Sequence, residues 1–430
     1  MRNVLVAVLV VLAAACGPDT RSGNPDGAGP ADACVGIGCQ VVDCAAQGKP
    51  PTSVSGTVYA PNGTLPLYGA TVYVPLTDPG PWPTGVQCSR CESQLPGAAA
   101  ASTTSGVDGK FTMTNVPAGS AVPLFITIGK WRRKVAIPSI EACTDNPLPA
   151  AITSLPKNKT EGELPKIAMG SGGCDQLECL LKKLGVADSE FTHDGGTGSI
   201  HLFNGGGLTS AHGQPLAAYS TLTGSLDKLK AYDIIMFSCD CSRDSTATRA
   251  MMDNVKAYAD LGGRAFFSHY HSQWLSGNGA VAPTVWPEVA QCNIDTTPSP
   301  TNQTAVIDQT GNPKGPAFAQ WMVNVMGSTT LGQVFVKDTR KTCTMIDPAR
   351  AERWVHLQDG SLQNFQLTTP VEAPIESKCG KVVMSDMHVS GGGTSGSFPA
   401  ACNSAGALSP QEKALAFMFF DIAGCVGEIL

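Results

Sequence analysis

Few of the 430 residues are charged: Lys, Arg, Asp and Glu make up 15% of the chain, and the formal net charge is −6. The sequence has no large basic block, and this argues against nucleic acid as a partner, because nucleic-acid-binding proteins carry clustered positive charge. After the N-terminal segment, no run is long and apolar enough to cross a bilayer, which takes about 20 residues. Glycine and proline are abundant instead, with 47 and 31 residues, which is typical of a β-rich, turn-rich extracytoplasmic protein.

The N-terminus has the pattern of a secretory signal. Arg2 precedes a short apolar run, Val4 to Ala15, that is too short for a mature membrane span. The end of this run and the residue after it, Leu-Ala-Ala-Ala-Cys at 12–16, resemble the lipobox of bacterial lipoproteins. The resemblance implies that residues 1–16 are removed up to Cys16, which is lipidated and anchors the chain to a lipid bilayer. The alternative is an ordinary signal with Cys16 as a plain thiol.

The resemblance also implies a cellular location. Gly17, and not Asp, follows Cys16, which in lipoproteins favours the outer membrane of the bacterial cell envelope. The rest of the chain is therefore expected to be exported and soluble.

Sixteen cysteines are present, so 15 remain if Cys16 is lipidated. In an oxidising compartment most should form disulfides, and an odd number leaves at least one over. Cys88 and Cys91 form a CxxC in a Pro/Gly loop, which predicts a local or cross-loop disulfide more than a redox site. The disulfide candidates are Cys34, Cys39, Cys44, Cys88, Cys91, Cys143, Cys174 and Cys179.

Composition and hydrophobic pattern divide the chain into segments. Residues 17–50 are rich in Gly, Pro, Asp and Ala, and predict a flexible, cysteine-containing tether. Residues 51–145 alternate apolar and polar positions, with Asp108-Gly109 as a hairpin signal. Their motifs SGTVYAPNG, YGATVYV and DGKFTMTNVPAG resemble the carboxypeptidase-regulatory-like domain, which implies a small transthyretin-like antiparallel β-sandwich. Residues 146–163 predict a Pro-rich linker.

Strand and helix patterns alternate over residues 164–430, which predicts a largely parallel, doubly wound α/β domain of flavodoxin-like type. Three of its apolar strands end in polar residues. Cys239 and Cys241 follow the first, His269, Tyr270 and His271 the second, and Asp386 and His388 the third. Ligands bind at the carboxyl ends of such strands, so these residues are expected to gather there. In an extended chain, positions i and i+2 face the same way, so Cys239 with Cys241, His269 with His271, and Asp386 with His388 are each expected to present a pair to one crevice.

Three of these segments, YDIIMFSCDCS, VKAYADLGGRAFFSHYHS and GKVVMSDMH, resemble the ThuA-like branch of the glutamine-amidotransferase-like superfamily. In amidotransferases a catalytic cysteine follows the Gly-Gly strand. Here Ser268 to His271 occupy that position, and the missing thiol argues against glutaminase activity.

Three interpretations of these strand ends stay open. The first is a divalent metal site, zinc by ligand type, built from His269, His271, Asp386 and His388, with Cys239 as a further ligand. The second is metal-free acid–base or nucleophilic chemistry using histidine and aspartate. The third is structural: the histidines satisfy strand ends, and Tyr270 and Trp274 line a cleft that binds a carbohydrate or peptide.

The function favoured by these patterns is an envelope-anchored binding or scaffolding protein. The alternative is a metal-dependent hydrolase acting on a carbohydrate or peptidoglycan-type substrate. Geometry separates the two, because a metal site requires the strand ends at His269 and His388 to be neighbours. A disulfide on Cys239 or Cys241 would exclude that residue as a thiolate ligand.

Overall fold

The computed structural model describes residues 34, 36–91, 93–244, 246–277, 286, 288–292, 301–389, 396–402 and 406–427. The signal peptide and Cys16 lie outside these residues, so lipidation stays a prediction. In the part that is described, no helix combines the length and the apolar character that a membrane span needs. The residues from Gly36 onward belong to one compact unit.

Two small sheets form the first part of this unit. Their strands are β1 (Ser53–Thr57), β2 (Thr71–Pro75), β3 (Ala99–Thr104), β4 (Lys110–Thr114), β5 (Gly119–Ile128), β6 (Trp131–Ile140) and β7 (Asp145–Pro147). One sheet has the order β4-β1-β7 and the other β3-β2-β5-β6. Buried side chains of both sheets, such as Val54 and Val72, belong to one hydrophobic cluster. The turn at Asp108-Gly109 is present, but the strands that it joins, β3 and β4, lie in different sheets and make no hairpin.

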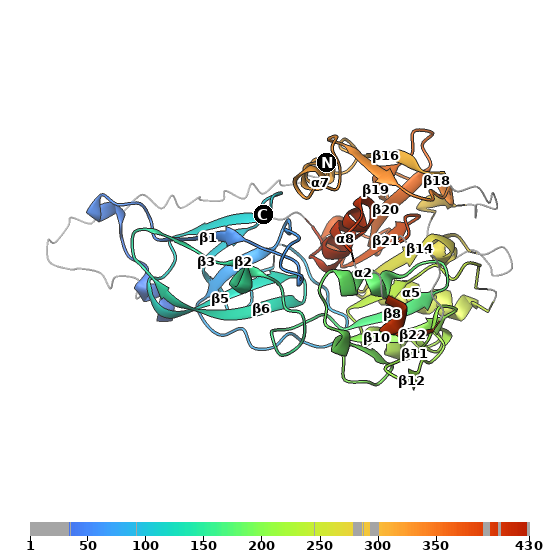
Figure 1. Cartoon of the computed structure of the whole chain (residues 1–430), viewed down its shortest axis with the longest axis horizontal. Coiled ribbons are helices and arrows are strands. Elements are labelled where there is room, and N and C mark those ends of the chain that lie inside the picture. Colours follow the sequence, from blue (N-terminus) through green and yellow to red (C-terminus); the bar gives the residue numbers. More distant parts are fainter. Residues whose placement is uncertain are drawn as a thin grey trace, which may run out of the picture. The chain divides into compact units, whose positions relative to one another are not determined.

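A ten-stranded mixed sheet dominates the rest of the unit (Figure 1). Its strands are β8 (Ile167–Gly172), β9 (Phe191–His193), β10 (Ile200–Gly205), β13 (Ile234–Phe237), β14 (Arg264–Ser268), β16 (Gln303–Ile307), β17 (Gln333–Val336), β19 (Glu352–His356), β20 (Leu362–Thr369) and β21 (Gly380–Ser385). The order is β17-β16-β19-β20-β21-β14-β13-β8-β10-β9.

The strands from β9 to β21 in this order are parallel, and β20, β19, β16 and β17 add an antiparallel extension. Within the parallel part, β10, β8, β13, β14 and β21 follow the flavodoxin-like order 2-1-3-4-5. The expectation of an α/β fold is therefore confirmed, whereas the antiparallel extension was not foreseen.

Alternating side chains bury both faces of the sheet. On β14, Phe266 joins one hydrophobic cluster, and Ala265 and Phe267 join the other. The first cluster contains side chains of α2 (Leu177–Lys183), α7 (Gly315–Asn324) and α8 (Pro410–Ala423). The second contains side chains of α3 (Ser220–Thr223), α4 (Leu226–Lys230) and α5 (Arg249–Asp260). Helices therefore cover both faces, as a doubly wound sheet requires.

The start of α8 is fixed by local hydrogen bonds. Ser409 caps the helix and forms a capping box with Glu412, and Pro410 is the first helical residue. The Ser409 hydroxyl accepts the N–H of Glu412, and the Glu412 carboxylate accepts the N–H of Ser409. Both backbone donors lack a partner within the helix, and Pro410 has no N–H to satisfy.

The remaining elements are short. One small sheet contains β11 (Leu208–Ala211), β12 (Gln214–Pro215) and β22 (Gly396–Phe398), and β15 (Ala290–Cys292) pairs with β18 (Cys343–Ile346). Two further helices are α1 (Ala150–Thr153) and α6 (Gln273–Ser276).

Two expected boundaries differ from the structure. The predicted tether, 17–50, ends earlier, because residues from Gly36 on belong to the compact unit and Cys44 is buried in a disulfide with Cys143. The predicted linker, 146–163, is built into the fold: β7 pairs in parallel with β1, and α1 follows it. Composition alone predicts that a short Pro-rich segment is flexible, but here the backbone of β7 pairs with a sheet.

Covalent bonds tie the small sheets to the large one. Cys88 pairs with Cys379, and Cys91 with Cys425. The prediction that both cysteines of this CxxC form disulfides is therefore confirmed, whereas a local pairing is wrong, because both partners lie in the α/β part. Aromatic packing continues across the same region, where Trp131 meets Phe419 and Phe420 edge-on.

A buried charge cluster lies on the same side of the large sheet as α8. Lys314 and Lys381 both approach the carboxylate of Asp421, with Nζ to Oδ distances of 2.6 and 3.4 Å. Burial raises the pKa of Asp421, but the two lysines outweigh it and hold that pKa at about 2. The carboxylate thus stays charged at neutral pH, beside the partly exposed Lys314 and the buried Lys381, whose pKa burial lowers to about 7.

Asp421→Asn should destabilise the protein by about 3 kcal/mol at pH 7, the lower end for a broken buried ion pair, because Lys381 can release its proton and Lys314 is partly exposed. In the wild type the pKa of Asp421 is about 2 in the folded state and about 4 in the unfolded chain. Its contribution should therefore be complete above about pH 4 and decline between about pH 4 and pH 2. Urea unfolding at a series of pH values measures both effects. Equal stability of the two proteins at pH 7 would rule out the role of this carboxylate.

Candidate functional site

Three neighbouring parallel strands bring the candidate residues together. β13, β14 and β21 lie side by side, with Phe237 opposite Phe267 and Ser268 opposite Ser385. Cys239 stands two residues beyond the end of β13, His269 directly follows β14, and His388 stands three residues beyond β21. All three thus lie at the carboxyl edge, where open α/β sheets bind ligands.

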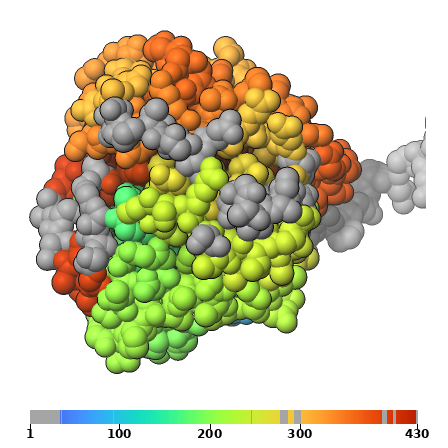
Figure 2. Space-filling model, turned by 90° about the vertical axis from the view of Figure 1, so that its right-hand side faces the viewer, coloured from blue at the N-terminus to red at the C-terminus, as the bar shows by residue number. Residues whose placement is uncertain are grey.

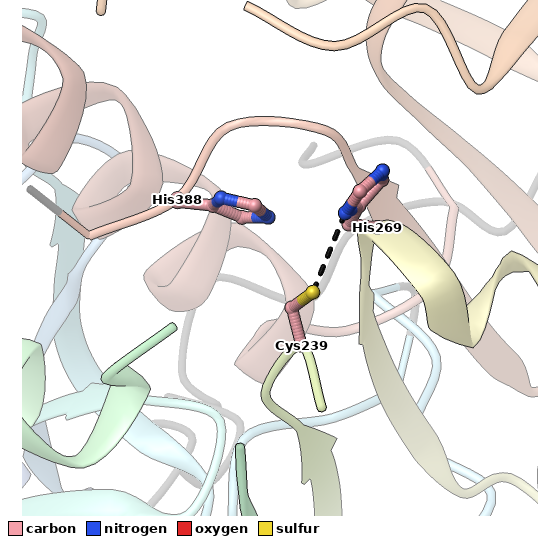
Figure 3. Close-up of side chains that lie close together, drawn as sticks. All are labelled: Cys239, His269 and His388. Carbon is pink, nitrogen blue, oxygen red and sulfur yellow. Dashed lines mark hydrogen bonds between the residues drawn. The ribbon is translucent and has the colours of Figure 1, made fainter. Parts of the chain in front are cut away.

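Their side chains converge on one point (Figure 3). The Sγ atom of Cys239 lies 3.3 Å from Nδ1 of His269, and the rings of His269 and His388 have centroids 5.2 Å apart. One ligand atom from each of the three residues lies within 4.8 Å of the others. Of the residues expected to bind a metal, this set contains Cys239, His269 and His388 and lacks His271 and Asp386.

The cluster is buried, and burial sets its charge. It raises the pKa of the Cys239 thiol to about 12. Burial, with His388 and Arg340 nearby, lowers the pKa of His269 to about 2, and burial also lowers the pKa of His388. Both imidazoles are therefore neutral at neutral pH, which is the form that binds metal ions.

Two ring nitrogens in the cluster lack hydrogen-bond partners. Nε2 of His269 and Nε2 of His388 are both buried, and neither meets a donor or acceptor among the residues that the structure describes. The one hydrogen bond within the cluster joins Cys239 Sγ and His269 Nδ1 and leaves both Nε2 atoms unpartnered. An unsatisfied buried polar group costs about 1–3 kcal/mol, so these residues are held in place for a reason other than mutual hydrogen bonding.

His269 has an unusual backbone. Its φ is +45°, in the left-handed region, at the point where β14 turns into a 3₁₀ turn over His269–Ser272. A non-glycine residue there is strained by roughly 1–3 kcal/mol, and such strain clusters at functional sites. This is the strand-to-helix elbow at which the amidotransferase resemblance places a catalytic cysteine.

The loop that carries Cys239 is fixed from β8. Cys174 donates its N–H to the Cys239 carbonyl, and its sulfur is bonded to Cys241. A Cβ on Gly172 would lie 2.1 Å from the same carbonyl oxygen, so only glycine allows this approach. The expectation that Cys239 and Cys241 present two thiols to one site is thus wrong: Cys241 staples the loop.

Cys239 is the one free cysteine among the described residues. Further disulfides join Cys179 to Cys402 and Cys292 to Cys343, and Cys34 and Cys39 are also disulfide-bonded. The thiol that the odd number leaves over is therefore the one at the strand ends.

Asp175 connects the two histidine loops. Its Oδ2 accepts a 2.6 Å hydrogen bond from the Ser268 hydroxyl, and its Oδ1 accepts one of 2.7 Å from the Val389 N–H. Ser268 precedes His269, and Val389 follows His388. One buried carboxylate thus holds both ligand-bearing loops, as supporting groups around metal sites do.

His271, Tyr270 and Trp274 have other roles. The 3₁₀ turn rotates His271 away from His269, so the expectation that the two face the same way is wrong. Its Nε2 lies 2.9 Å from the Ser238 carbonyl, and Trp274 donates its Nε1–H to Nδ1. Trp274 is fully buried, while Tyr270 is partly exposed and its ring lies 4.2 Å from that of His269.

Asp386 also lies outside the cluster. Its Oδ2 accepts a hydrogen bond from the N–H of Thr342, at 2.8 Å, and its own N–H donates to the carbonyl of Gln363. Asp386 therefore fixes a neighbouring segment to the loop of His388 and is no member of the Cys239, His269 and His388 group.

A second group of potential ligands does not form a metal site. Glu178 lies beside Cys179 and Cys402, but these two sulfurs are bonded to each other. Burial raises the pKa of Glu178 to about 8, so its carboxyl is largely neutral at pH 7.

A cavity of about 710 Å³ lies elsewhere, lined by residues of the small sheets and of α8, among them Lys130 and Asp421. None of the three cluster residues lines it. Figure 2 shows one face of the molecule. On it, the yellow-green surface of the segments around β13 and β14 lies between the green surface of earlier residues and the orange surface of later residues. Segments far apart in the sequence thus meet on that face.

Comparison with known proteins gives no family. No protein-family model and no characterised protein matches the sequence. Among solved structures, the chain is similar to a putative ThuA-like protein from Bacteroides uniformis, with 12% identity, a TM-score of 0.32, and coverage of 59% of this chain and 88% of that one. At these values the similarity carries no conclusion about activity.

Two other solved structures are similar to parts of the chain. A cohesin–X-dockerin complex from Acetivibrio cellulolyticus has 18% identity and a TM-score of 0.17, and covers 33% of this chain and 75% of its own. An exo-β-1,4-mannosidase from an Opitutaceae bacterium has 10% identity and a TM-score of 0.25, and covers 56% of this chain and 33% of its own.

Asp175→Ala should lower the free energy of unfolding by about 2–3 kcal/mol, because it leaves the Ser268 hydroxyl and the Val389 N–H without acceptors in a buried place. Urea unfolding measures the loss. Asp253→Ala is the matched control: its ion pair with Arg249 is exposed, so the change should stay below about 0.5 kcal/mol. Equal effects of the two substitutions would contradict the role of Asp175.

Proposed function

We propose that this chain is an envelope-anchored metalloprotein that binds one zinc ion through Cys239, His269 and His388. The observation that carries the proposal is the convergence of a free thiol and two neutral imidazoles within 4.8 Å at the strand ends. Three protein ligands with a fourth position open are typical of catalytic zinc sites, whereas structural sites use four.

The ligand spacing fits such an ion after small adjustments. Tetrahedral zinc, with bonds of about 2.3 Å to sulfur and 2.0–2.1 Å to nitrogen, separates its ligands by about 3.4–3.6 Å. The distance from Cys239 Sγ to His269 Nδ1 is 3.3 Å, close to this value. Thiolate and imidazole ligands also favour zinc over harder cations, which prefer oxygen ligands.

The residues of the chain supply position and environment. The elbow holds His269, the Cys174–Cys241 disulfide holds the Cys239 loop, and Asp175 holds both histidine loops. When bound, a zinc ion in this setting supplies Lewis-acid chemistry for hydrolysis. His269 at the elbow position leaves no nucleophilic thiol there, which supports an activity other than glutamine hydrolysis.

The location and substrate class belong to the same proposal. The lipobox-like N-terminus supports attachment to the bacterial envelope, and a carbohydrate or peptidoglycan-type substrate is the class found there. A binding or scaffolding role without turnover, the function favoured by the sequence patterns, needs no metal. Metal content therefore separates the two functions.

The chain from residue 17 should contain about one equivalent of zinc by elemental mass spectrometry after expression and export to an oxidising compartment. Cys239→Ser, His269→Ala and His388→Ala should each lose most of it, because a two-ligand site binds far more weakly. His356→Ala is a matched control, since among the described residues the His356 ring bonds the neighbouring Leu357 carbonyl, and it should retain the metal.

His271→Asn and Cys239→Ser test the composition of the site. The structure predicts that the first keeps the metal and the second loses it, whereas the set expected from sequence alone predicts loss in the first. Circular dichroism of every variant monitors folding. Absence of metal from the folded wild-type protein, even after incubation with zinc, would refute the proposal and favour the binding role.

A further inference from the structure

The cavity of about 710 Å³ lies at the amino edge of the large sheet, opposite to the edge that carries the cluster. Arg264, the first residue of β14, lines it, and so does Asp233, which directly precedes β13. The two ends of β14 are about 13 Å apart, because a strand rises by about 3.3 Å per residue. Residues of the small sheets, of the segment 82–96 and of α8 form the other walls. The cavity is therefore a second concave site of the chain, separate from the cluster.

Direct contacts gather charged residues at one end of this cavity. Arg264 donates an Nη2–H to the Gly424 carbonyl at 3.2 Å, and its backbone N–H to the Asp233 carbonyl at 3.3 Å. The Asp233 carboxylate lies 2.5 Å from Nζ of Lys130. Gly129 packs so closely against α8 that a Cβ there would lie 1.9 Å from a carbonyl oxygen of this helix. All five residues line the cavity, so Arg264, Lys130 and Asp233 surround the same end of it.

Arg264 has no carboxylate partner at this end. It is 5% exposed, and its guanidinium forms no ion pair with any residue that the structure describes. Its side-chain bonds go to the carbonyls of Gly262, Cys379 and Gly424, which leaves two of its N–H donors over, since a guanidinium has five. Burial lowers the pKa of Arg264, but only to about 10, so the group is charged at neutral pH. A buried charge without a counter-charge is costly.

The lining carries more positive than negative side chains. Its cations are Arg90, Lys130, Arg264 and Lys314, and its carboxylates are Asp233 and Asp421.

Charged groups behind the lining do not reverse this balance. Lys166 lies next to Asp233, to which it donates its N–H. Lys381 lies 3.4 Å from Asp421, and its pKa is about 7. Glu352 adds one carboxylate near Lys314, and the carbonyl end of α8 adds about half a negative charge. Arg132 and Glu163 pair with each other and cancel. A positive surplus therefore remains even when Lys381 is neutral.

The rest of the cavity suits an organic molecule. Phe417 and Phe420 of α8 and Trp321 of α7 line it, and the rings of Trp321 and Phe417 have centroids 5.3 Å apart. Thr71 and Thr104, which lie opposite each other on β2 and β3, add hydroxyl groups. Sites for small organic ligands are typically cavities of about 300–1,000 Å³, mostly apolar with a few polar groups, and they often lie where structural parts meet.

We infer that this cavity binds a small organic anion, whose carboxylate or phosphate oxygens contact Arg264 and whose apolar or aromatic body packs against Phe420 and Trp321. Guanidinium groups bind such oxygens through charge-assisted hydrogen bonds. The inference goes beyond the proposed function and does not depend on the metal site, which lies at the opposite edge of the sheet.

Isothermal titration calorimetry at pH 7.5 tests the inference on the chain from residue 17. The probes are 2-naphthoate, 2-naphthyl phosphate and the neutral 2-naphthamide, which have the same aromatic body. At least one of the two anions should bind saturably with one site per chain. Naphthamide should bind roughly tenfold more weakly or less, because it lacks the charge-assisted bond. The same titration after treatment with a chelator should give the same affinity.

Substitutions of Arg264 test where the anion lies. Arg264→Gln should weaken binding of the anion by roughly tenfold or more, the effect of losing one charge-assisted hydrogen bond. Arg264→Lys should retain part of the affinity. Arg353→Gln is the matched control, because Arg353 pairs with Asp308 and does not line the cavity, and it should match the wild type.

Thr71→Trp tests the cavity without changing a buried charge. Thr71 is partly exposed and lies opposite Thr127, whose hydroxyl donates to the Gly129 carbonyl. An indole at this position fills space next to the charged end, and tryptophan suits a β-strand, so the variant should fold and lose anion binding. Thr112→Trp, exposed on β4 and outside the cavity, should bind as the wild type does.

Circular dichroism establishes the folding of every variant. The inference is overturned if neither anion binds the folded wild type at millimolar concentration, or if naphthamide binds as tightly as the anions. Unchanged binding in folded Arg264→Gln or in Thr71→Trp would also overturn it. Loss of binding after chelation would place the anion at a metal and overturn the cavity site. If Arg264→Gln does not fold, the three probes and Thr71→Trp still decide.

Discussion

The candidate site depends on one constraint: parallel strands that lie side by side present their carboxyl ends at the same edge. β13, β14 and β21 are three such neighbours, so Cys239, His269 and His388 meet although they are 30 and 119 residues apart along the chain. The apolar strands themselves contribute no ligand. They are buried on both faces, which fixes their register, and a slip of one residue would exchange the two faces of the sheet.

The surroundings convert this convergence into a site of defined chemistry. Every other described cysteine is in a disulfide, so one buried thiol remains, and it lies beside two imidazoles. The Cys174–Cys241 bond and the close approach at Gly172 set the path of the loop around that thiol. Asp175 ties together the loops of the two histidines. These contacts hold the loops that surround His269, so the rest of the fold can maintain the backbone strain at that residue.

The sequence was sufficient for the α/β alternation and for the edge at which polar residues gather, because these follow from periodicity and from the parallel order of the strands. It failed where long-range geometry decides. His269 and His271 read as a pair facing one way, but the chain leaves the extended conformation at the elbow, and the two rings separate. The CxxC of Cys88 and Cys91 predicts a local or cross-loop disulfide but not its partners, which are about 290 and 330 residues away. Asp175 was missed, although an acidic residue just after the first strand of a parallel sheet was a usable signal.

X-ray absorption at the zinc edge tests the central claim most directly, because it reports the atoms bound to the metal. We expect one sulfur at about 2.3 Å and two imidazole nitrogens at about 2.0–2.1 Å, with a further light atom completing the shell. Cys239→Ser should remove the sulfur signal. A shell of oxygen and nitrogen without sulfur, or one with two or more sulfurs, would contradict a site built from Cys239, His269 and His388.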